Sequence, residues 1–103
     1  MRIITLPTLL CRFQGLALGK VILIKKGHEG LIEHEKIHIA QQKRVGFFTY
    51  MWRWWFSERF RAVAEIEAYR VADGLSDSAI VDKLVDLYGI SPGMAYAYIL
   101  GVR

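Results

Sequence analysis

The sequence has little cysteine, little proline and no long apolar run. Its single cysteine, Cys11, excludes a fold held together by intrachain disulfides. No stretch approaches the roughly 20 consecutive apolar residues that a membrane-spanning helix needs. Near the N-terminus, Pro7 interrupts the apolar residues and no small-residue cleavage site precedes Cys11, which argues against a signal peptide. We therefore expect residues 1–15 to belong to the fold, in a protein that is cytoplasmic or peripheral at a membrane.

What the sequence does contain is enough apolar material for one core. The 103 residues are 53% hydrophobic, and 14 Lys and Arg face 10 Asp and Glu. This length suits one domain over residues 1–103. The small excess of positive charge permits contact with nucleic acid or anionic lipid without requiring it. Cys11 is expected to be a small buried apolar residue, and a thiolate that caps a metal is the alternative.

Local patterns predict a small α+β domain in which helix dominates. Residues 3–19 are broken by proline and glycine and predict a weakly organised segment with one short strand. Residues 20–26 hold four apolar strand formers between lysines, which is typical of an edge strand. Such an edge can accept an extended peptide as an added strand. Helices are predicted over about 29–44, over 47–73 with a bend, over 78–88 and over 92–100, with glycines at 46, 74 and 89 ending the first three.

The division within this domain is a core over residues 20–74 and a C-terminal helical pair over residues 76–100. The pair has the outline of a helix-turn-helix, but its second helix, Met94–Leu100, carries no basic or amide side chain to read bases. Nucleic-acid binding is therefore not expected. The pair is expected to pack against the first half, or to cover a cleft there as a pro-segment.

The strongest chemical signal is HEKIH at residues 34–38. On a helix, His34 and His38 lie about 40° apart, so both imidazoles can bind one tetrahedral zinc ion. Glu35 projects about 60° from His38, which places its carboxylate beside a bound water rather than on the metal. The alternative is a solvated polar stripe in which Glu33, Glu35 and Lys36 are surface charges.

A catalytic zinc site needs a third protein ligand. His28 precedes His34 by six residues, which puts it about 240° around a helix and off the face. Three glutamates follow the motif, and Glu65 and Glu67 are about 200° apart, so only one of them can face the metal.

Packing favours the first of these two glutamates. Small alanines flank Glu65 and let a second helix approach closely, whereas Glu67 lies on a bulkier apolar face. Glu67 stays the alternative ligand. The other interpretation is that both are surface charges that pair with Arg61 and Arg70.

The segment HEKIHIAQ, followed on a later helix by EIEAY at residues 65–69, resembles the gluzincin metallopeptidases. The likeness is strongest to their minimal bacterial and phage domains of the HExxHxxQ type, and it covers residues 20–73. It implies one zinc ion and the ligand set His34, His38 and Glu65. It also implies hydrolysis of peptide bonds, with Glu35 as the general base and an edge strand that holds the substrate.

The resemblance thus predicts a zinc metalloendopeptidase, either active or latent. Tyr69 and Arg70 are candidate stabilisers of the oxyanion. Tyr69 also stands where these families carry an aspartate that supports a ligand histidine, so that support is expected to be missing here.

Residues 46–61, GFFTYMWRWWFSERFR, concentrate the aromatic residues of the chain. Apolar side chains occur on every face, which is typical of a core helix, here packed on the motif helix. The alternative is an interfacial membrane segment over residues 47–60 with basic residues around it. A groove for a hydrophobic partner is a further alternative. In these cases the chain would be a non-catalytic membrane- or protein-interaction module that retains a metal site.

Overall fold

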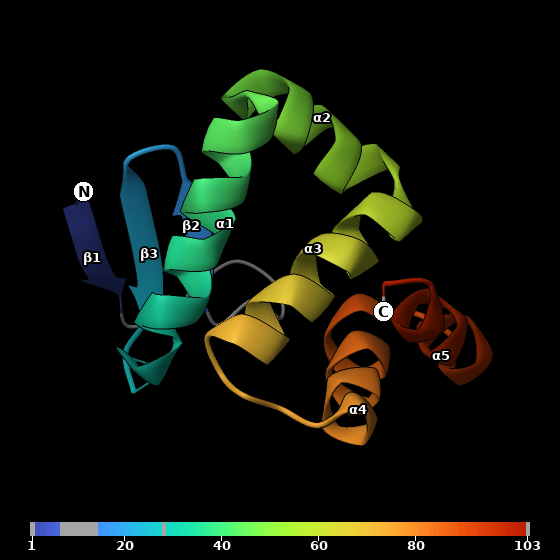
Figure 1. The fold of residues 1–103 in the computed structure, drawn as a ribbon. Coiled ribbons are helices and arrows are strands. Elements are labelled where there is room, and N and C mark those ends of the chain that lie inside the picture. The colour runs from blue at the N-terminus through green and yellow to red at the C-terminus, as the bar shows by residue number, and fades with distance from the viewer. Residues whose placement is uncertain (1, 7–14, 28, 103) are drawn as a thin grey trace.

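The computed structural model describes residues 2–6, 15–27 and 29–102, so Cys11 and His28 lie outside the described residues. In the described part, a small three-stranded sheet precedes five α-helices, which confirms the predicted α+β class with helix dominating (Figure 1). The radius of gyration of 13.1 Å is typical of a compact chain of this length. None of the described helices combines the length and apolarity needed to cross a membrane.

The sheet has the strand order β1-β3-β2. Strand β3 pairs in parallel with β1 and antiparallel with β2. Alternate side chains of β3, Ile22 and Ile24, are fully buried against α1. The strand bounds are Arg2–Leu6 for β1, Gly15–Leu18 for β2 and Val21–Lys25 for β3.

The prediction that residues 20–26 form an edge strand is wrong, because β3 is the central strand of this sheet. The lysines that suggested an edge stand at the ends of the strand, where they do not hinder pairing on either side. The preceding residues contribute two strands in place of one, and β2 is the edge strand that lies beside α1.

The helix α1, which carries the HEKIH motif, and the helix α3, which carries Glu65, are joined by α2, which arches between them (Figure 1). The 3-10 turn η1 leads into α1, and Gly46, with a φ of 98°, ends it. The single bent helix predicted over 47–73 is two helices, because Ser57 adopts an extended backbone and caps α3 by accepting the N–H of Phe60. The bounds are Glu29–Leu31 for η1, Ile32–Val45 for α1, Phe47–Phe56 for α2 and Glu58–Val71 for α3.

The helix α2 is not the core helix that its composition predicted. Tyr50 and Trp54 are buried against α3, but most of its other aromatic side chains are exposed. The buried stripe of α2 therefore positions α3, and the remainder of α2 faces outward.

The C-terminal helices α4 (Asp77–Tyr88) and α5 (Pro92–Gly101) pack on α3 and form the largest core cluster with it. Ser76 and Ser91 cap them, and Gly89 joins them in the left-handed conformation. This packing brings the last residue of α4 to the side of α3 that faces α1. The buried members of the cluster are Ala62, Ile66, Tyr69, Ile80, Val81, Leu84, Ile90, Ala95 and Ile99.

Candidate metal centre

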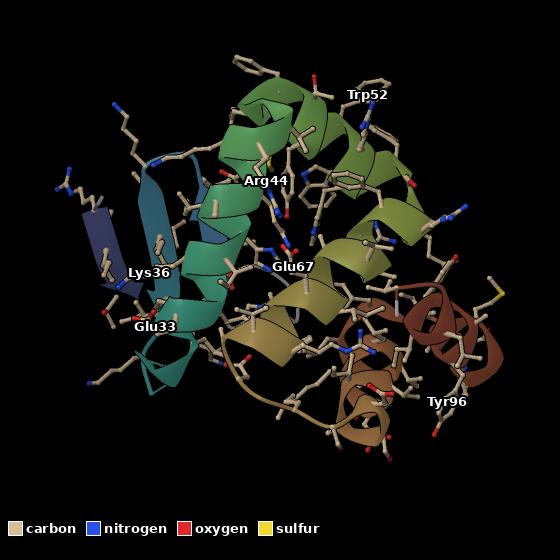
Figure 2. All side chains as sticks on the ribbon, in the orientation of Figure 1. Glu33, Lys36, Arg44, Trp52, Glu67 and Tyr96 are labelled. Atoms are coloured by element: carbon tan, nitrogen blue, oxygen red, sulfur yellow. The ribbon has the colours of Figure 1, made fainter. Side chains whose placement is uncertain are left out.

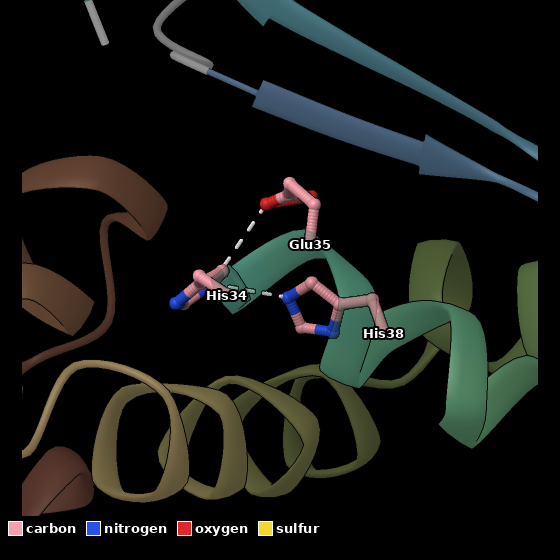
Figure 3. A group of neighbouring side chains, drawn as sticks. All are labelled: His34, Glu35 and His38. Carbon is pink, nitrogen blue, oxygen red and sulfur yellow. Dashed lines mark hydrogen bonds and ion pairs between the residues drawn. The ribbon is translucent and has the colours of Figure 1, made fainter. Parts of the chain in front are cut away.

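His34, Glu35 and His38 lie together on one side of α1 and are all buried (Figure 3). The two histidines project toward α3, and their Nε2 atoms are 3.2 Å apart. Glu35 points instead toward β2 (Figure 3). The potential ligand atoms of these three residues lie within 4.8 Å of one another, which is close enough for one metal ion.

Glu65 of α3 completes this group from the opposite side. Its Oε2 atom lies 3.3 Å from Nε2 of His34 and 2.5 Å from Nε2 of His38. Zinc bound tetrahedrally by nitrogen and oxygen at about 2.0–2.1 Å separates its ligand atoms by about 3.3 Å. The separations between the two histidines and between His34 and Glu65 match that value. The separation between His38 and Glu65 is shorter, and a small shift of Glu65 away from His38 would bring it to the same value. The residues present therefore fit a zinc ion.

Each histidine is held from behind by an acceptor on its Nδ1 atom. Nδ1 of His34 donates to Oδ2 of Asp73 at 2.8 Å, and Nδ1 of His38 donates to Oε1 of Gln41 at 2.9 Å. An imidazole that donates through Nδ1 presents the lone pair of Nε2 when it is neutral. Both lone pairs then point to the space that Glu65 also faces, which is how ligand histidines are oriented in metal sites.

Gln41 and Tyr50 fix the support of His38. The Nε2 amide group of Gln41 donates to the carbonyl of Ala64 at 3.0 Å and to Glu67 at 2.8 Å, so its Oε1 must be the acceptor. The hydroxyl of Tyr50 also donates to that oxygen, at 2.9 Å. This network ties α1, α2 and α3 together directly behind the metal-facing side of His38.

Burial and charge pull the pKa values of this cluster in opposite directions. Burial alone would lower the pKa of His38, but the charge and hydrogen bond of Glu65, together with the charge of Glu35 and the hydrogen bond to Gln41, raise it to about 9. The pKa of His34 is raised for the same reason. Burial would raise the pKa of Glu65, yet the two histidines hold it well below its usual range. Without a metal, a Glu65 carboxylate paired with protonated imidazole occupies the centre.

Glu35 stands apart from this pairing. Its Oε2 atom is 4.0 Å from Nε2 of His34, which exceeds the separation of about 3.3 Å between two ligand atoms of one tetrahedral zinc ion. Burial raises the pKa of Glu35 to about 7; the two histidines oppose this rise and the charge of Glu65 adds to it. Gly15 of β2 lies so close that a Cβ atom there would be 3.2 Å from Cγ of Glu35. The strand thus sets the position of this carboxylate.

The other predicted site residues are placed as follows. Glu67 lies beside Arg44 (Figure 2), with 2.7 Å between its Oε1 and Nη2 of Arg44, and it accepts from Gln41 rather than from a histidine. Arg70 pairs with Asp77 at 2.9 Å and is directed to α4. Tyr69 does lie at the cluster, with its ring centroid 4.3 Å from that of His34.

Two residues that the sequence analysis did not select also belong here. Asp73 supplies the carboxylate support for a ligand histidine that was expected to be missing. Tyr88, the last residue of α4, donates its hydroxyl to Oε1 of Glu65. Burial and the charge of Glu65 raise the pKa of Tyr88 well above its usual value, so this hydroxyl stays protonated.

A cleft of about 250 Å³ opens beside the cluster, between β2 and the helices α2 and α3. Gln42 of α1 fastens β2 along it: Gly19 N–H donates to Oε1 of Gln42 at 2.8 Å, and Nε2 of Gln42 donates to the carbonyl of Ala17 at 2.7 Å. The cleft is lined by Gly15, Leu16, Ala17, Leu18, Glu35, His38, Gln42, Tyr50, Met51, Trp54, Trp55, Glu65 and Tyr88.

No protein-family model matches the chain, and the searches of curated proteins and of solved structures find no match either. What this centre can do chemically therefore has to be judged from its own geometry.

Proposed function

We propose that His34, His38 and Glu65 bind one zinc ion and that the protein is a zinc-dependent hydrolase of peptide bonds. The observation that carries this proposal is the convergence of two Nε2 atoms and one carboxylate oxygen, with each histidine held at Nδ1 by a separate acceptor. Two histidines and one carboxylate, with a fourth position left for water, form a donor set typical of catalytic zinc.

The remaining residues of the cleft suit the roles that hydrolysis needs. A zinc ion bound there would acidify a water molecule and polarise a substrate carbonyl. Glu35 lies outside the ligand set but beside it, and a carboxyl with a pKa of about 7 can accept a proton from water and pass it to the leaving amine. The hydroxyl of Tyr88 lines the same cleft and is protonated, but it donates to Oε1 of Glu65, so it would have to turn from that oxygen to donate to a developing oxyanion. Tyr88 is nearer to the cluster than Arg70, which pairs with Asp77 of α4.

The edge of β2 suits an extended peptide as the substrate. A two-residue turn joins β2 to β3, with Leu18 opposite Val21, so the backbone groups of Gly15 and Ala17 point away from β3. No other strand covers this outer edge among the described residues. The carbonyl of Ala17 already accepts a hydrogen bond from Gln42, whereas the backbone of Gly15 lies directly beside Glu35. A peptide that pairs here would pass the carboxylate that activates water.

The test is zinc content together with peptide hydrolysis. Protein purified without added metal should contain about one zinc per chain by mass spectrometry, as one three-ligand site requires. Glu35→Gln should keep the zinc but hydrolyse a quenched fluorescent peptide library at least about 100-fold more slowly. Loss of a general base usually lowers a rate by at least about this factor. Glu65→Ala should lose the zinc, and Glu67→Ala, two residues along the same helix, should keep both zinc and activity.

Three results would contradict this proposal in different ways. Absence of zinc from the wild type would remove the metal centre itself. If the wild type contains zinc but hydrolyses no library peptide, the proposed zinc site stands and the proposed hydrolase activity is contradicted. Loss of zinc from Glu67→Ala but not from Glu65→Ala would show that the ligand assignment is wrong.

A further inference from the structure

The helix α2 carries a continuous aromatic surface that the metal centre does not use. Four large side chains of this ten-residue helix are more than half exposed: Phe48 by 85%, Trp52 by 68%, Trp55 by 54% and Phe56 by 73%. We call Phe48, Trp52, Trp55 and Phe56 the aromatic surface. Trp52 and Phe56 also contact each other, with ring centroids 4.5 Å apart, and Trp52 lies on the outer side of α2 (Figure 2).

The exposed side chains share one side of the helix. At about 100° per residue, all four fall within an arc of about 100°. The buried pair, Tyr50 and Trp54, lies on the opposite side and packs on α3. Single exposed apolar residues are normal on protein surfaces, but four adjacent aromatic side chains on one short helix form a patch of the kind that marks an interaction site.

The charges around the aromatic surface are mostly positive. From Lys36 to Ser57 the sequence contains four basic residues and no acidic one, and the exposed Glu58 follows. Among the basic residues, Lys43 in the last turn of α1 and Arg53 of α2 are exposed, and Arg59 lies at the start of α3. Lys20 adds a further positive charge, since its neighbour in the turn, Gly19, lies beside the ring of Phe47.

We propose that the aromatic surface inserts into the interfacial layer of a membrane that contains anionic lipid. Aromatic side chains favour the headgroup level of a bilayer, and basic residues around them favour its negative charge. A second copy of this chain is a poorer occupant, because a two-fold contact would set the basic rim of one copy against the basic rim of the other. Trp55 also lines the cleft, so the membrane-bound protein would hold the opening of its cleft near the lipid headgroups.

The experiment is vesicle co-sedimentation with the full chain. Wild type should bind phosphatidylcholine vesicles with roughly 30% phosphatidylserine and bind pure phosphatidylcholine much more weakly, because the charge attraction is then missing. High salt should weaken the binding through screening. The triple variant F48S/W52S/F56S should bind at least about tenfold more weakly, because it removes most of the inserting apolar area. Lys43→Gln should weaken binding about fivefold.

The matched control removes exposed apolar side chains elsewhere. Tyr96 and Leu100 are exposed by 50% and 63% on α5, away from α2 (Figure 2). The variant Y96S/L100S should bind vesicles as wild type does. Glu35→Gln should also bind as wild type does, because the aromatic surface does not depend on the metal centre, and this separates the present proposal from that of hydrolysis.

Three outcomes would overturn the proposal. The first is that wild type does not bind the anionic vesicles, or that brominated lipid fails to quench its tryptophan fluorescence. The second is equal binding by wild type and the triple variant. The third is a wild-type dimer, seen by light scattering and absent from the triple variant, which would assign the aromatic surface to a second copy.

Discussion

Glu65→Gln in the metal-free protein tests the charge balance at the centre of the cluster. Glu65 is 2% exposed, and its Oε2 atom contacts Nε2 of both His34 and His38. Glutamine keeps nearly the same shape and removes the negative charge. The substitution therefore leaves packing almost unchanged and removes the partner that holds His38 in its protonated form.

The magnitude follows from the pKa of His38. Burial lowers this pKa, and its net rise from 6.5 to about 9 results from the charge and hydrogen bond of Glu65, with smaller contributions from Glu35 and Gln41. At about 1.4 kcal/mol per tenfold change in proton affinity, that rise corresponds to about 3 kcal/mol. Breaking a buried ion pair by removing one partner costs about 3–5 kcal/mol, which agrees. We expect Glu65→Gln to lower the free energy of unfolding of the metal-free protein by about 3 kcal/mol near pH 6.

The loss should depend on pH in a definite direction. Because the pKa of His38 is higher in the folded than in the unfolded chain, its stabilisation is complete below pH 6.5 and disappears as the pH rises through about 9. The lowered pKa of Glu65 reflects the same ion pair with His38, so it adds no separate contribution to the free energy of unfolding. Burial, the main cause of the raised pKa of Glu35, persists in the variant, so Glu35 contributes little to the difference.

The measurement is urea unfolding in the presence of a chelator at several pH values from about 6 to 9.5, a range chosen from the His38 titration. Glu67→Gln is the control, since its half-exposed pair with Arg44 should contribute less than about 1 kcal/mol. The wild type and Glu65→Gln should differ most near pH 6 and little above pH 9. A difference that stays constant over this range, or that equals the effect of Glu67→Gln, would refute the reasoning.

Two further substitutions test the surroundings of the cluster. Gly15→Ala should reduce hydrolysis and leave zinc content unchanged, because its Cβ would press on Glu35 at 3.2 Å; Gly30→Ala, with nothing within 4 Å, is the control in a peptide assay. Unchanged activity in Gly15→Ala would show that Glu35 tolerates displacement. Asp73→Asn should weaken zinc binding about 10- to 100-fold in a competition titration, because it removes the anionic support of His34. An unchanged affinity would show that His34 needs no such support.

The placement of His34, Glu35 and His38 on one side of a helix could be predicted from the sequence, because helical spacing alone determines which side chains share a side. The sequence also favoured Glu65, which the structure places against the histidines, although the packing reason was incomplete. Ala62 packs toward α4 and α5 rather than α1, and the residue whose backbone approaches α1 is Ala64, through Gln41.

The residues that the sequence could not supply are those positioned by tertiary packing. Asp73 follows the last turn of α3, so helical spacing from Glu65 does not extend to it. Tyr88 reaches Glu65 only because α4 packs back on α3, and no local pattern specifies that return. The order of the strands is likewise set by pairing between distant residues, which is why β3 was mistaken for an edge.

The two sides of α2 show why an aromatic helix is difficult to interpret from its sequence. Tyr50 and Trp54 form one stripe at a spacing of four, and Phe48, Trp52 and Phe56 form another with the same spacing. Both stripes are equally apolar, so periodicity cannot tell which one packs on the protein. The difference lies in hydrogen bonding: the hydroxyl of Tyr50 completes the network behind His38, whereas phenylalanine offers no such group. The stripe with the phenol therefore faces His38 and Gln41, and the other stripe faces outward, where we propose that it contacts a membrane.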